Sequence, residues 1–469
     1  MPTSNQHDNS STAPQAFSTA SQFLSTASQA NPSESRRKFL RGGLVTTASA
    51  LSVSSTLHAN ETPAVHQSTS DTSSSGEPIR IALIGCGGRG TGALNDSMSI
   101  NDNVKLVALA DLRKEKCERT RKSMFGRHKE KVDVADDKMH EGLDAYKRVL
   151  DDPNVDLVLL TTSPGFRPSH LAEAVDAGKH IFAEKPTCVD VAGYHTCLAA
   201  HDRAVTNGTA IVTGTQYRRQ TNYVAAVEQI RQGAIGDIVS ATSRYCSNSI
   251  WFKNRQPGMS ELDYQLNNWM HFIWLSGDQI VEQAVHNIDA MNWVMGSAPE
   301  TAYGSGGRFT RPDGSEMWDS MSIDYQYPGN RVLSFMCRQI PNTKSDNGNV
   351  IYGTEGTMYI DALSRGSRMM DRKGNEVWSA KGSISDAYRH EHKELVDSIT
   401  SGKPIVELKE TAKSSLTAVM GRLAAYTGQQ VTWDFLTKKS TLNLFPESLS
   451  PDNFPASSGH AIPGQTKLT

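Results

Sequence analysis

The hydrophobic pattern divides the chain into two halves of different character. Short, mostly apolar runs at 79–84, 104–110, 155–161 and 180–183 alternate with segments of helical length. Continuous apolar runs are typical of strands buried on both faces of a parallel sheet, and their alternation with helices is typical of βαβ units. Residues 78–213 are therefore predicted to form an α/β domain with a doubly wound parallel sheet.

In the second half, short strands are separated by Gly, Pro and Asn turns. This pattern favours a largely antiparallel, open sheet, and residues 214–435 are predicted to form a second α/β domain. The predicted strands cover 237–245, 321–325, 331–337, 349–352, 357–360 and 376–378. The predicted helices cover 222–232, 280–295, 385–401 and 409–427.

The N-terminal segment, residues 1–59, has the features of an export leader. Its first part is rich in Ser, Thr, Gln and Asn and cannot bury enough apolar surface to fold. Arg36 and Arg37 then precede a weakly apolar run that ends in Leu57-His58-Ala59. This order is typical of a cleaved signal peptide, and the paired arginines are typical of the twin-arginine type. The sequence therefore predicts export to the periplasm or another extracytoplasmic space, with no membrane span in the mature form.

Two further segments show no periodic pattern. Residues 60–77 are rich in Ser and Thr and are predicted to be a linker. Residues 436–469 form a polar tail with four prolines. The sequence is compatible with a disordered tail and with a tail that packs on a neighbouring subunit.

Composition narrows the range of functions. The chain has 469 residues and a net charge of −2, without the basic excess of a protein that binds nucleic acid or an anionic membrane. Its six cysteines include no CxxC pair. Buried free thiols are therefore expected, and neither a zinc site nor a disulfide framework is predicted.

A glycine-rich turn follows the first predicted strand. The run from Gly85 to Gly90 reads GxGxxG and leads directly into a predicted helix. Gly85 permits a tight turn, Gly87 lets the backbone approach a pyrophosphate, and Gly90 lets the helix pack closely on the strand. This arrangement predicts a Rossmann domain that binds a dinucleotide.

The choice between NAD and NADP depends on the end of the second strand. Asp111 lies about 20 residues after the glycines, where a carboxylate accepts hydrogen bonds from the ribose hydroxyls. A carboxylate also repels a 2′-phosphate, so NAD is favoured. Arg113 and Lys114 follow and could accept that phosphate, which leaves NADP open.

A polar stripe on the predicted helix 280–295 is the main candidate for a substrate site. Glu282, His286, Asp289 and Trp293 share one face, while Val281, Val285 and Ile288 belong to an apolar face. The polar face contains no Lys or Arg and includes a Trp, which is unusual for a solvated surface. An imidazole titrates near neutrality, so His286 suits a general base.

Four motifs resemble those of the Gfo/Idh/MocA family, the glucose–fructose oxidoreductase-like proteins. They are Asp152–Asp156, Ala177–His180, Glu184–Pro186 and Gly353–Thr357, and the resemblance extends over about 78–435. It implies an NAD(P)-dependent oxidoreductase that commonly forms a dimer or tetramer. With the glycine motif, it implies a cofactor site of Gly85, Gly87, Gly88, Arg89, Gly90, Asp111, Thr162, Ser163, Pro164, Glu184 and Lys185.

The resemblance also implies a reacting centre. The family carries Asp-x-Gly-x-His-x-x-Asp on this helix; His286 and Asp289 match it, whereas Glu282 and Ala284 depart from it. Lys185 is expected to polarise the reacting oxygen. The expected catalytic residues are Lys185, His286, Asp289 and Tyr217, and the expected substrate contacts are Glu282, His286 and Arg218.

A metal site is not predicted. The run 388–394 contains two histidines and two glutamates, but adjacent residues on a helix diverge by about 100° and do not converge on one ion.

The predicted function is oxidation of a sugar or polyol hydroxyl by hydride transfer, with a tightly held cofactor that is regenerated within the cycle. The alternative is an NAD-dependent glycoside hydrolase that works through a transient 3-keto intermediate. The chain resembles that group of enzymes in its Gly-Gly-Arg-Gly turn and its leader. A third class, a non-catalytic binding protein with the same fold, is also open. The expected partner is a small carbohydrate.

Overall fold

The computed structural model describes residues 76–469 apart from 364 and 458. The predicted leader at 1–59 lies outside the described residues, as does nearly all of the predicted linker. No helix within the described part of the chain is long and apolar enough to span a membrane.

The N-terminal domain contains a six-stranded sheet in the order β3-β2-β1-β4-β5-β6, with every pair parallel. The strand order reverses between β1 and β4, and this switch point opens a crevice at the carboxyl ends of the strands. The prediction of a doubly wound parallel sheet is confirmed. Its elements are β1 Ile79–Ile84, α1 Gly88–Ile100, β2 Val104–Asp111, α2 Lys114–Arg127, β3 Met139–Glu141, α3 Ala145–Leu150, β4 Leu157–Leu160, α4 Arg167–Asp176, β5 His180–Ala183, α5 Val191–Asn207 and β6 Ile211–Thr213.

The second domain contains a nine-stranded sheet in the order β14-β13-β12-β11-β7-β10-β9-β8-β15. Among the described strands of this second sheet, only the β7–β10 pair is parallel, so the predicted, largely antiparallel character is confirmed. Its strands are β7 Ile238–Ser247, β8 Thr301–Gly307, β9 Ser320–Tyr327, β10 Arg331–Gln339, β11 Asp346–Gly353, β12 Gly356–Asp361, β13 Ser367–Asp371, β14 Glu376–Ala380 and β15 Val431–Thr432. The prediction missed β8, β13 and β15; β8 is rich in glycine and β15 is very short, so neither has a strand-like sequence.

Helices cover one face of this large sheet. Residues of β9 alternate between buried and exposed along the strand, which is the pattern of a sheet with one packed face and one open face. The helices of this domain are α6 Thr221–Arg231, α7 Glu261–Asn267, α8 Ile273–Ser276, α9 Gln279–Glu282, α10 Val285–Met295, α11 Ile384–Thr400, α12 Leu408–Thr427 and α13 Trp433–Lys438.

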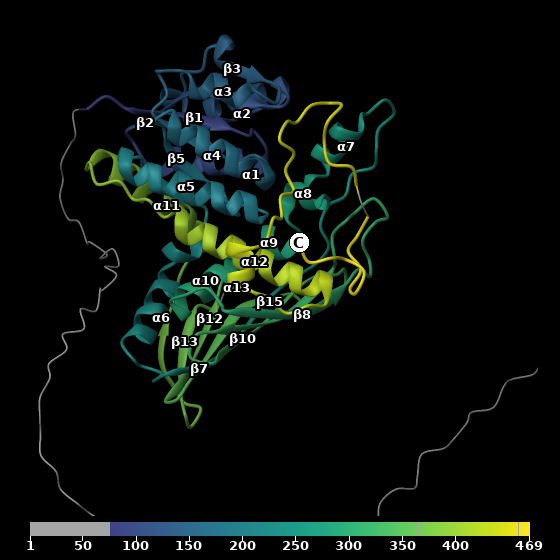
Figure 1. Ribbon diagram of the computed structural model, residues 1–469. Helices are drawn as coiled ribbons and strands as arrows, with labels where there is room; N and C mark the ends of the chain where they lie inside the picture. Colours follow the sequence, from purple (N-terminus) through teal and green to yellow (C-terminus); the bar gives the residue numbers. More distant parts are fainter. Residues whose placement is uncertain (1–75, 364, 458) are drawn as a thin grey trace, which may run out of the picture. The chain divides into compact units, whose positions relative to one another are not determined.

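Two C-terminal helices join the two domains. Helix α12 runs between the two sheets (Figure 1), and it packs on α5 of the first domain as well as on β8 and β9 of the second. Helix α11 packs on α1, and its Leu395 and Val396 belong to the apolar core of the N-terminal sheet. The sequence assigned α11 to the second domain, whereas its apolar face is buried against the first.

The helix predicted at 280–295 is divided into α9 and α10. Neither Gly nor Pro causes the break, since the linking residues are Gln283 and Ala284. Instead, the main-chain oxygen of Glu282 accepts a hydrogen bond from Lys185 Nζ. A carbonyl bonded to a side chain does not continue the helical ladder, so a residue of the first domain ends α9.

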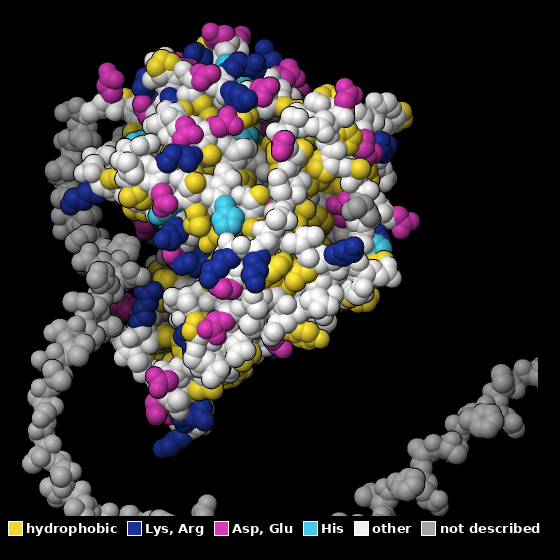
Figure 2. Space-filling model, in the orientation of Figure 1, with side chains coloured by type: hydrophobic (Ala, Val, Ile, Leu, Met, Phe, Trp, Pro, Cys, Tyr) yellow, Lys and Arg dark blue, Asp and Glu magenta, His cyan; other side chains and the backbone are white. Residues whose placement is uncertain are grey.

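The C-terminal tail packs on its own chain. Phe445 lies 5.1 Å from the ring of Phe166 and 5.7 Å from the ring of Trp274, measured between centroids. Leu444, Phe445, Leu449 and Phe454 pack against an apolar cluster beneath α7 and α8. Hydrophobic side chains gather on this face of the molecule where the tail meets these helices (Figure 2). Among the described residues, the tail therefore holds the segment between β7 and α9 in place.

Candidate active site

One pocket of about 490 Å³ lies where the two domains meet. Its lining combines the carboxyl ends of the parallel strands with residues of β7, α9, α10 and α11. The lining includes every residue predicted to bind the cofactor: Gly85, Gly87, Gly88, Arg89, Gly90, Asp111, Thr162, Ser163, Pro164, Glu184 and Lys185.

The glycines form a cradle that matches a dinucleotide. Gly85 has φ +100°, and a Cβ there would lie 2.8 Å from the carbonyl carbon of Thr161. A Cβ on Gly90 would lie 2.1 Å from the oxygen of Gly85, whereas Gly87 and Gly88 have no atom within 4 Å of that position. Helix α1 begins at Gly88 without a side-chain cap, so its first N–H groups are free to meet a phosphate. These residues fit the pyrophosphate of NAD.

Asp111 lies at the ribose end of the cradle. Its Oδ2 accepts a hydrogen bond of 2.8 Å from the Cys86 N–H, and Lys116 Nζ is 3.4 Å from its Oδ1. The Arg113 guanidinium is 3.6 Å from Asp263 of α7, and Lys114 is exposed outside the pocket lining. The sequence missed Lys116, which lines the pocket one helical turn beyond the predicted cations.

Lys185 and Glu282 meet at the carboxyl end of β5. Lys185 Nζ donates to the main-chain oxygen of Glu282 and lies 3.2 Å from its Oε1. Gln283 donates to Glu282 Oε2 and accepts a 3.1 Å hydrogen bond from the Tyr245 hydroxyl. An ammonium group has three donors, and Glu282 is the only described residue to which it donates. One N–H of Lys185 therefore remains for a ligand in the pocket.

His286 lines the same part of the pocket. Its Nδ1 is buried without a hydrogen-bond partner among the described residues. Burial, assisted by the charges of Lys185 and Arg89, lowers the pKa of His286 well below the usual 6.5. The imidazole is therefore neutral at pH 7 and able to accept a proton.

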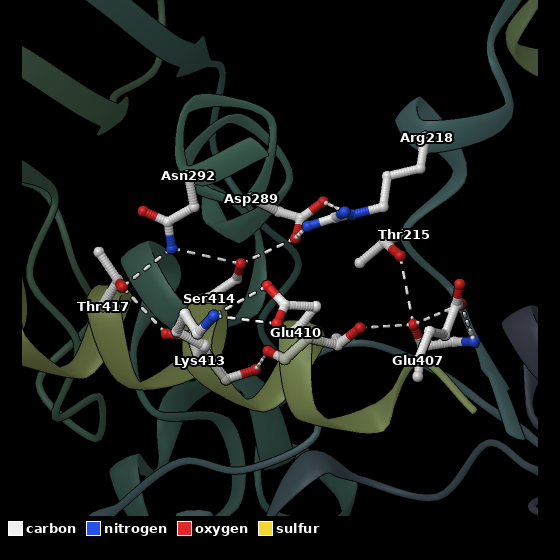
Figure 3. Close-up of polar contacts among 12 residues, drawn as sticks. Thr215, Arg218, Asp289, Asn292, Glu407, Glu410, Lys413, Ser414 and Thr417 are labelled. Atoms are coloured by element: carbon white, nitrogen blue, oxygen red, sulfur yellow. Dashed lines mark hydrogen bonds and ion pairs between the residues drawn. The ribbon is translucent and has the colours of Figure 1, made fainter. Parts of the chain in front are cut away.

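Asp289 and Arg218, predicted to act on substrate, do not line the pocket. Arg218 forms a bidentate pair with Asp289, with Nε–Oδ2 and Nη2–Oδ1 distances of 2.9 and 2.8 Å. Ser414 donates a further hydrogen bond of 2.8 Å to Asp289 (Figure 3). Asp289 makes no hydrogen bond to His286, and Trp293, the last member of the predicted stripe, contacts the Arg218 guanidinium. This pair occupies a structural position behind the site.

Tyr217 also lies outside the pocket lining. It is buried, its ring stacks on Tyr223 at 4.6 Å, and its hydroxyl accepts a hydrogen bond from Asn347. Burial raises the pKa of Tyr217 well above the usual range. Tyr245 lines the pocket in place of Tyr217, and sequence reasoning missed it; its position at the end of a predicted strand is the signal that could have found it.

Arg89 is held by acids from two distant segments. It forms an ion pair with Glu184, and its Nη2 lies 3.7 Å from Glu391 of α11. Burial opposes its charge, but these carboxylates outweigh burial and raise the pKa of Arg89. Its guanidinium also lies 4.5 Å from the ring centre of Tyr388, which lines the pocket. No sequence signal connected α11 with the glycine turn, because the contact joins the beginning of the first predicted domain to a helix near the end of the second.

No group of three or more potential metal ligands occurs among the described residues. The two histidines of 388–394 on α11 differ in surroundings: His392 is buried against Phe182, and His390 is exposed. All six cysteines are free and buried, as the sequence predicted.

Comparison with known proteins identifies the family of both domains. Residues 79–207 match the oxidoreductase family with an NAD-binding Rossmann fold, GFO/IDH/MocA, and residues 223–359 match the GFO/IDH/MocA C-terminal domain. Together these matches cover more than half of the chain.

Three proteins illustrate the similarity. Myo-inositol 2-dehydrogenase from Thermotoga maritima is 23% identical over 348 residues, which are 72% of this chain and 93% of the relative. An alpha-N-acetylgalactosaminidase from Shewanella oneidensis is 22% identical over 241 residues, about half of each chain. The structure of scyllo-inositol dehydrogenase from Lactobacillus casei with NAD(H) and scyllo-inositol has a TM-score of 0.59 at 18% identity, covering 76% of this chain and 99% of that one.

The cradle at the switch point and the two family matches agree. The protein belongs to the Gfo/Idh/MocA family and is an oxidoreductase whose N-terminal Rossmann domain binds NAD.

Proposed function

We propose that this oxidoreductase acts on a hydroxyl of a cyclic polyol or sugar. The observation that carries the proposal is the convergence of an ammonium group, Lys185, and a neutral imidazole, His286, in the pocket that contains the glycine cradle. The names of two relatives, a myo-inositol and a scyllo-inositol dehydrogenase, support a polyhydroxylated ring as substrate.

The roles of the side chains follow from their charges. Bound NAD supplies the acceptor for a hydride from the carbon that bears the hydroxyl. His286 removes the hydroxyl proton, for which its neutral form is required. The free N–H of Lys185 donates to the reacting oxygen as negative charge develops on it. Glu282 and Gln283 hold Lys185 and Tyr245 in position.

A glycoside hydrolase is the second candidate. Its specific support is the relative named alpha-N-acetylgalactosaminidase, although the match covers only half of that protein. In that reaction the same oxidation creates a ketone, which acidifies the neighbouring C–H so that the aglycone leaves by elimination. Water then adds, and reduction of the ketone restores the cofactor, so no net redox change occurs.

Two measurements on the purified protein separate these candidates. Denaturation followed by chromatography identifies any dinucleotide that the protein carries. A scan of inositols, hexoses and 4-nitrophenyl glycosides, with and without added NAD, then records absorbance at 340 nm and release of nitrophenol. Net NADH with added NAD supports the oxidoreductase. Nitrophenol without added cofactor supports the hydrolase, and neither signal with any substrate contradicts both.

We further propose that the protein is exported through the twin-arginine route. The leader that carries this proposal, residues 1–59, lies outside the described residues. The support is the order of Arg36-Arg37, the apolar run and Leu57-His58-Ala59. Free NAD is scarce outside the cytoplasm, so an exported enzyme needs a captive cofactor. Replacing both arginines with lysine should leave the protein inside the cell, as fractionation would show; unchanged export would contradict this proposal.

We also propose assembly into a dimer or tetramer through the open face of the large sheet. Val239, Tyr303, Val332, Met336 and Tyr352 expose apolar surface on its strands. Light scattering of the wild type and of Met336→Lys tests this face. A monomeric wild type, or a variant with unchanged mass, would rule it out.

A further inference from the structure

The second domain contributes to the pocket at the ribose end of the cofactor cradle. There the pocket lining includes Asp111, Leu112 and Leu143 of the first domain. It also includes residues from the stretch 248–278, which we call the β7–α9 segment: Ile250, Trp251, Leu266, Trp269 and Met270. The nucleotide site is therefore built from both domains.

Charged side chains connect the β7–α9 segment to this end of the cradle. Arg113, two residues after Asp111, has its Nη2 3.6 Å from Oδ1 of Asp263 on α7. Burial, assisted by the charges of Lys116 and Arg113, lowers the pKa of Lys253, so this cation of the segment lies within electrostatic range of both. Lys116 Nζ in turn lies 3.4 Å from Asp111 Oδ1. The charged groups of the segment therefore meet the first domain beside the residue that faces the adenosine ribose.

Apolar contacts join the same two surfaces. Leu143 and Phe166 line the pocket and also pack against a buried cluster of the segment, Leu262, Phe272, Trp274 and Leu275. The two backbones approach closely, since a Cβ on Gly165 would lie 2.3 Å from the main-chain oxygen of Trp274. This packing holds the segment against the loops that follow β3 and β4.

The C-terminal tail supports the segment without reaching the pocket. Phe445 packs on Phe166 and Trp274 but does not belong to the pocket lining. Gln265 of α7 donates a hydrogen bond of 3.2 Å to the main-chain oxygen of Pro455. The tail passes α7 and α8 in Figure 1. Phe445 can therefore be changed without removing a side chain that lines the cofactor site.

We propose that the β7–α9 segment encloses the adenosine half of bound NAD, so that NAD leaves only when the segment separates from the first domain. In a Rossmann domain the adenosine ribose lies at the acid that ends the second strand, which is Asp111 here. Release then requires the apolar and charged contacts of the segment to open together, and such cooperative opening is rare in a packed region. The enzyme consequently keeps its NAD through many turnovers, whichever hydroxyl it oxidises.

Exchange of bound nucleotide tests the proposal without turnover. The protein is loaded with radiolabelled NAD or radiolabelled ADP-ribose and mixed with an excess of the unlabelled ligand. The label that stays bound is counted after gel filtration at successive times. We expect the wild type to retain both ligands with similar half-lives, because both contain the adenosine half.

Phe445→Ser should release both ligands about tenfold faster, because the segment loses the apolar support of the tail. Phe309→Ser, at an exposed phenylalanine between β8 and β9, is the control and should keep the wild-type rates. Circular dichroism confirms that both variants are folded.

A charge reversal on α7 tests the same contact without changing the apolar cluster. Asp263→Lys places a cation beside Arg113 and should release both ligands about threefold faster. Glu261→Lys is the matched control on the same helix, since Glu261 pairs with Arg255 inside the segment. This variant keeps the proposal testable if Phe445→Ser does not fold.

Three results would overturn the proposal. One is complete exchange of NAD by the wild type within the time of gel filtration. Another is slow release of NAD with rapid release of ADP-ribose, which would assign retention to the nicotinamide end. The third is a wild-type rate in the folded Phe445→Ser and Asp263→Lys variants, which would show that the segment does not enclose the nucleotide.

Discussion

Two pairs of opposite charge lie along the α9–α10 segment, and they differ in their position relative to the pocket. Lys185 pairs with Glu282 and lines the pocket, whereas Arg218 pairs with Asp289 and does not. Asp289 receives three hydrogen bonds, two from Arg218 and one from Ser414. Among the residues that the structure describes, Lys185 donates only to Glu282.

This difference separates a reacting pair from a structural one. The Arg218–Asp289 pair lies outside the pocket lining, so it stabilises one arrangement of the chain and is not placed to meet a ligand. A partly satisfied ammonium group on a pocket wall has a donor available for an oxygen that gains negative charge. Position in the pocket lining, more than burial, indicates which carboxylate of the stripe belongs to the chemistry.

The largest effect is expected at the reacting pair. Lys185→Met should lower kcat about 10³-fold, because the donor to the reacting oxygen is lost. Steady-state kinetics on the best substrate measure the effect, and circular dichroism checks the fold. Lys438→Met, at an exposed ion pair of α13, should retain full activity. A Lys185→Met enzyme within tenfold of the wild type would remove the pair from the chemistry.

The structural pair should respond in stability. Asp289→Ala leaves the partly buried Arg218 charge unpaired and should lower the free energy of unfolding by about 2 kcal/mol. The double variant Arg218→Met/Asp289→Leu should recover most of that loss, since no uncompensated charge remains. Urea unfolding measures both values. If the folded Asp289→Ala enzyme lost as much kcat as Lys185→Met, the contrast between the pairs would be wrong.

Glu282 provides a finer test of the reacting pair. Glu282→Gln keeps the main-chain contact to Lys185 but removes the negative charge beside it. We expect about a tenfold loss of kcat with little change in the melting temperature. Glu410→Gln, at an exposed pair of α12, is the matched control. A loss as large as that of Lys185→Met would give Glu282 a direct role in proton transfer.

The smallest effect is expected in the pH profile. Because burial lowers the pKa of His286, the acid limb of kcat/KM should lie below the pH of about 6.5 at which an ordinary imidazole titrates, and a profile of kcat/KM from pH 5 to 8 measures it. An acid limb near pH 6.5 would exclude His286 in this environment as the base.

The free energy of unfolding should decrease in acid because of two other buried histidines. Burial lowers the pKa of His170 to about 3 and that of His271 to about 4, below the unfolded value near 6.5. Between these values the unfolded chain binds more protons than the folded one, so stability is present above pH 6.5 and falls as pH decreases. Each histidine contributes up to about 1.4 kcal/mol per pH unit. Melting temperatures from pH 7.5 to 5 measure the decline.

The sequence by itself determined the features that depend on local geometry. GxGxxG after an apolar strand requires a tight turn and a free helix N-terminus, so the cradle from Gly85 to Gly90 and the place of Asp111 were predictable. Lys185, which follows the buried strand β5, was predicted through the family resemblance and not from local geometry. The parallel and antiparallel character of the two sheets followed from the hydrophobic patterns.

Only the tertiary structure decided how distant segments share the pocket. Helical spacing placed Glu282, His286 and Asp289 on one face, but a lysine from the first domain ends α9 and divides the stripe. Contacts across the chain also decided that Arg218 binds Asp289, that Tyr388 reaches the glycine turn, and that the tail packs on the segment between β7 and α9. Pairing and burial of this kind depend on which surfaces meet after folding, and no local pattern in the chain specifies that.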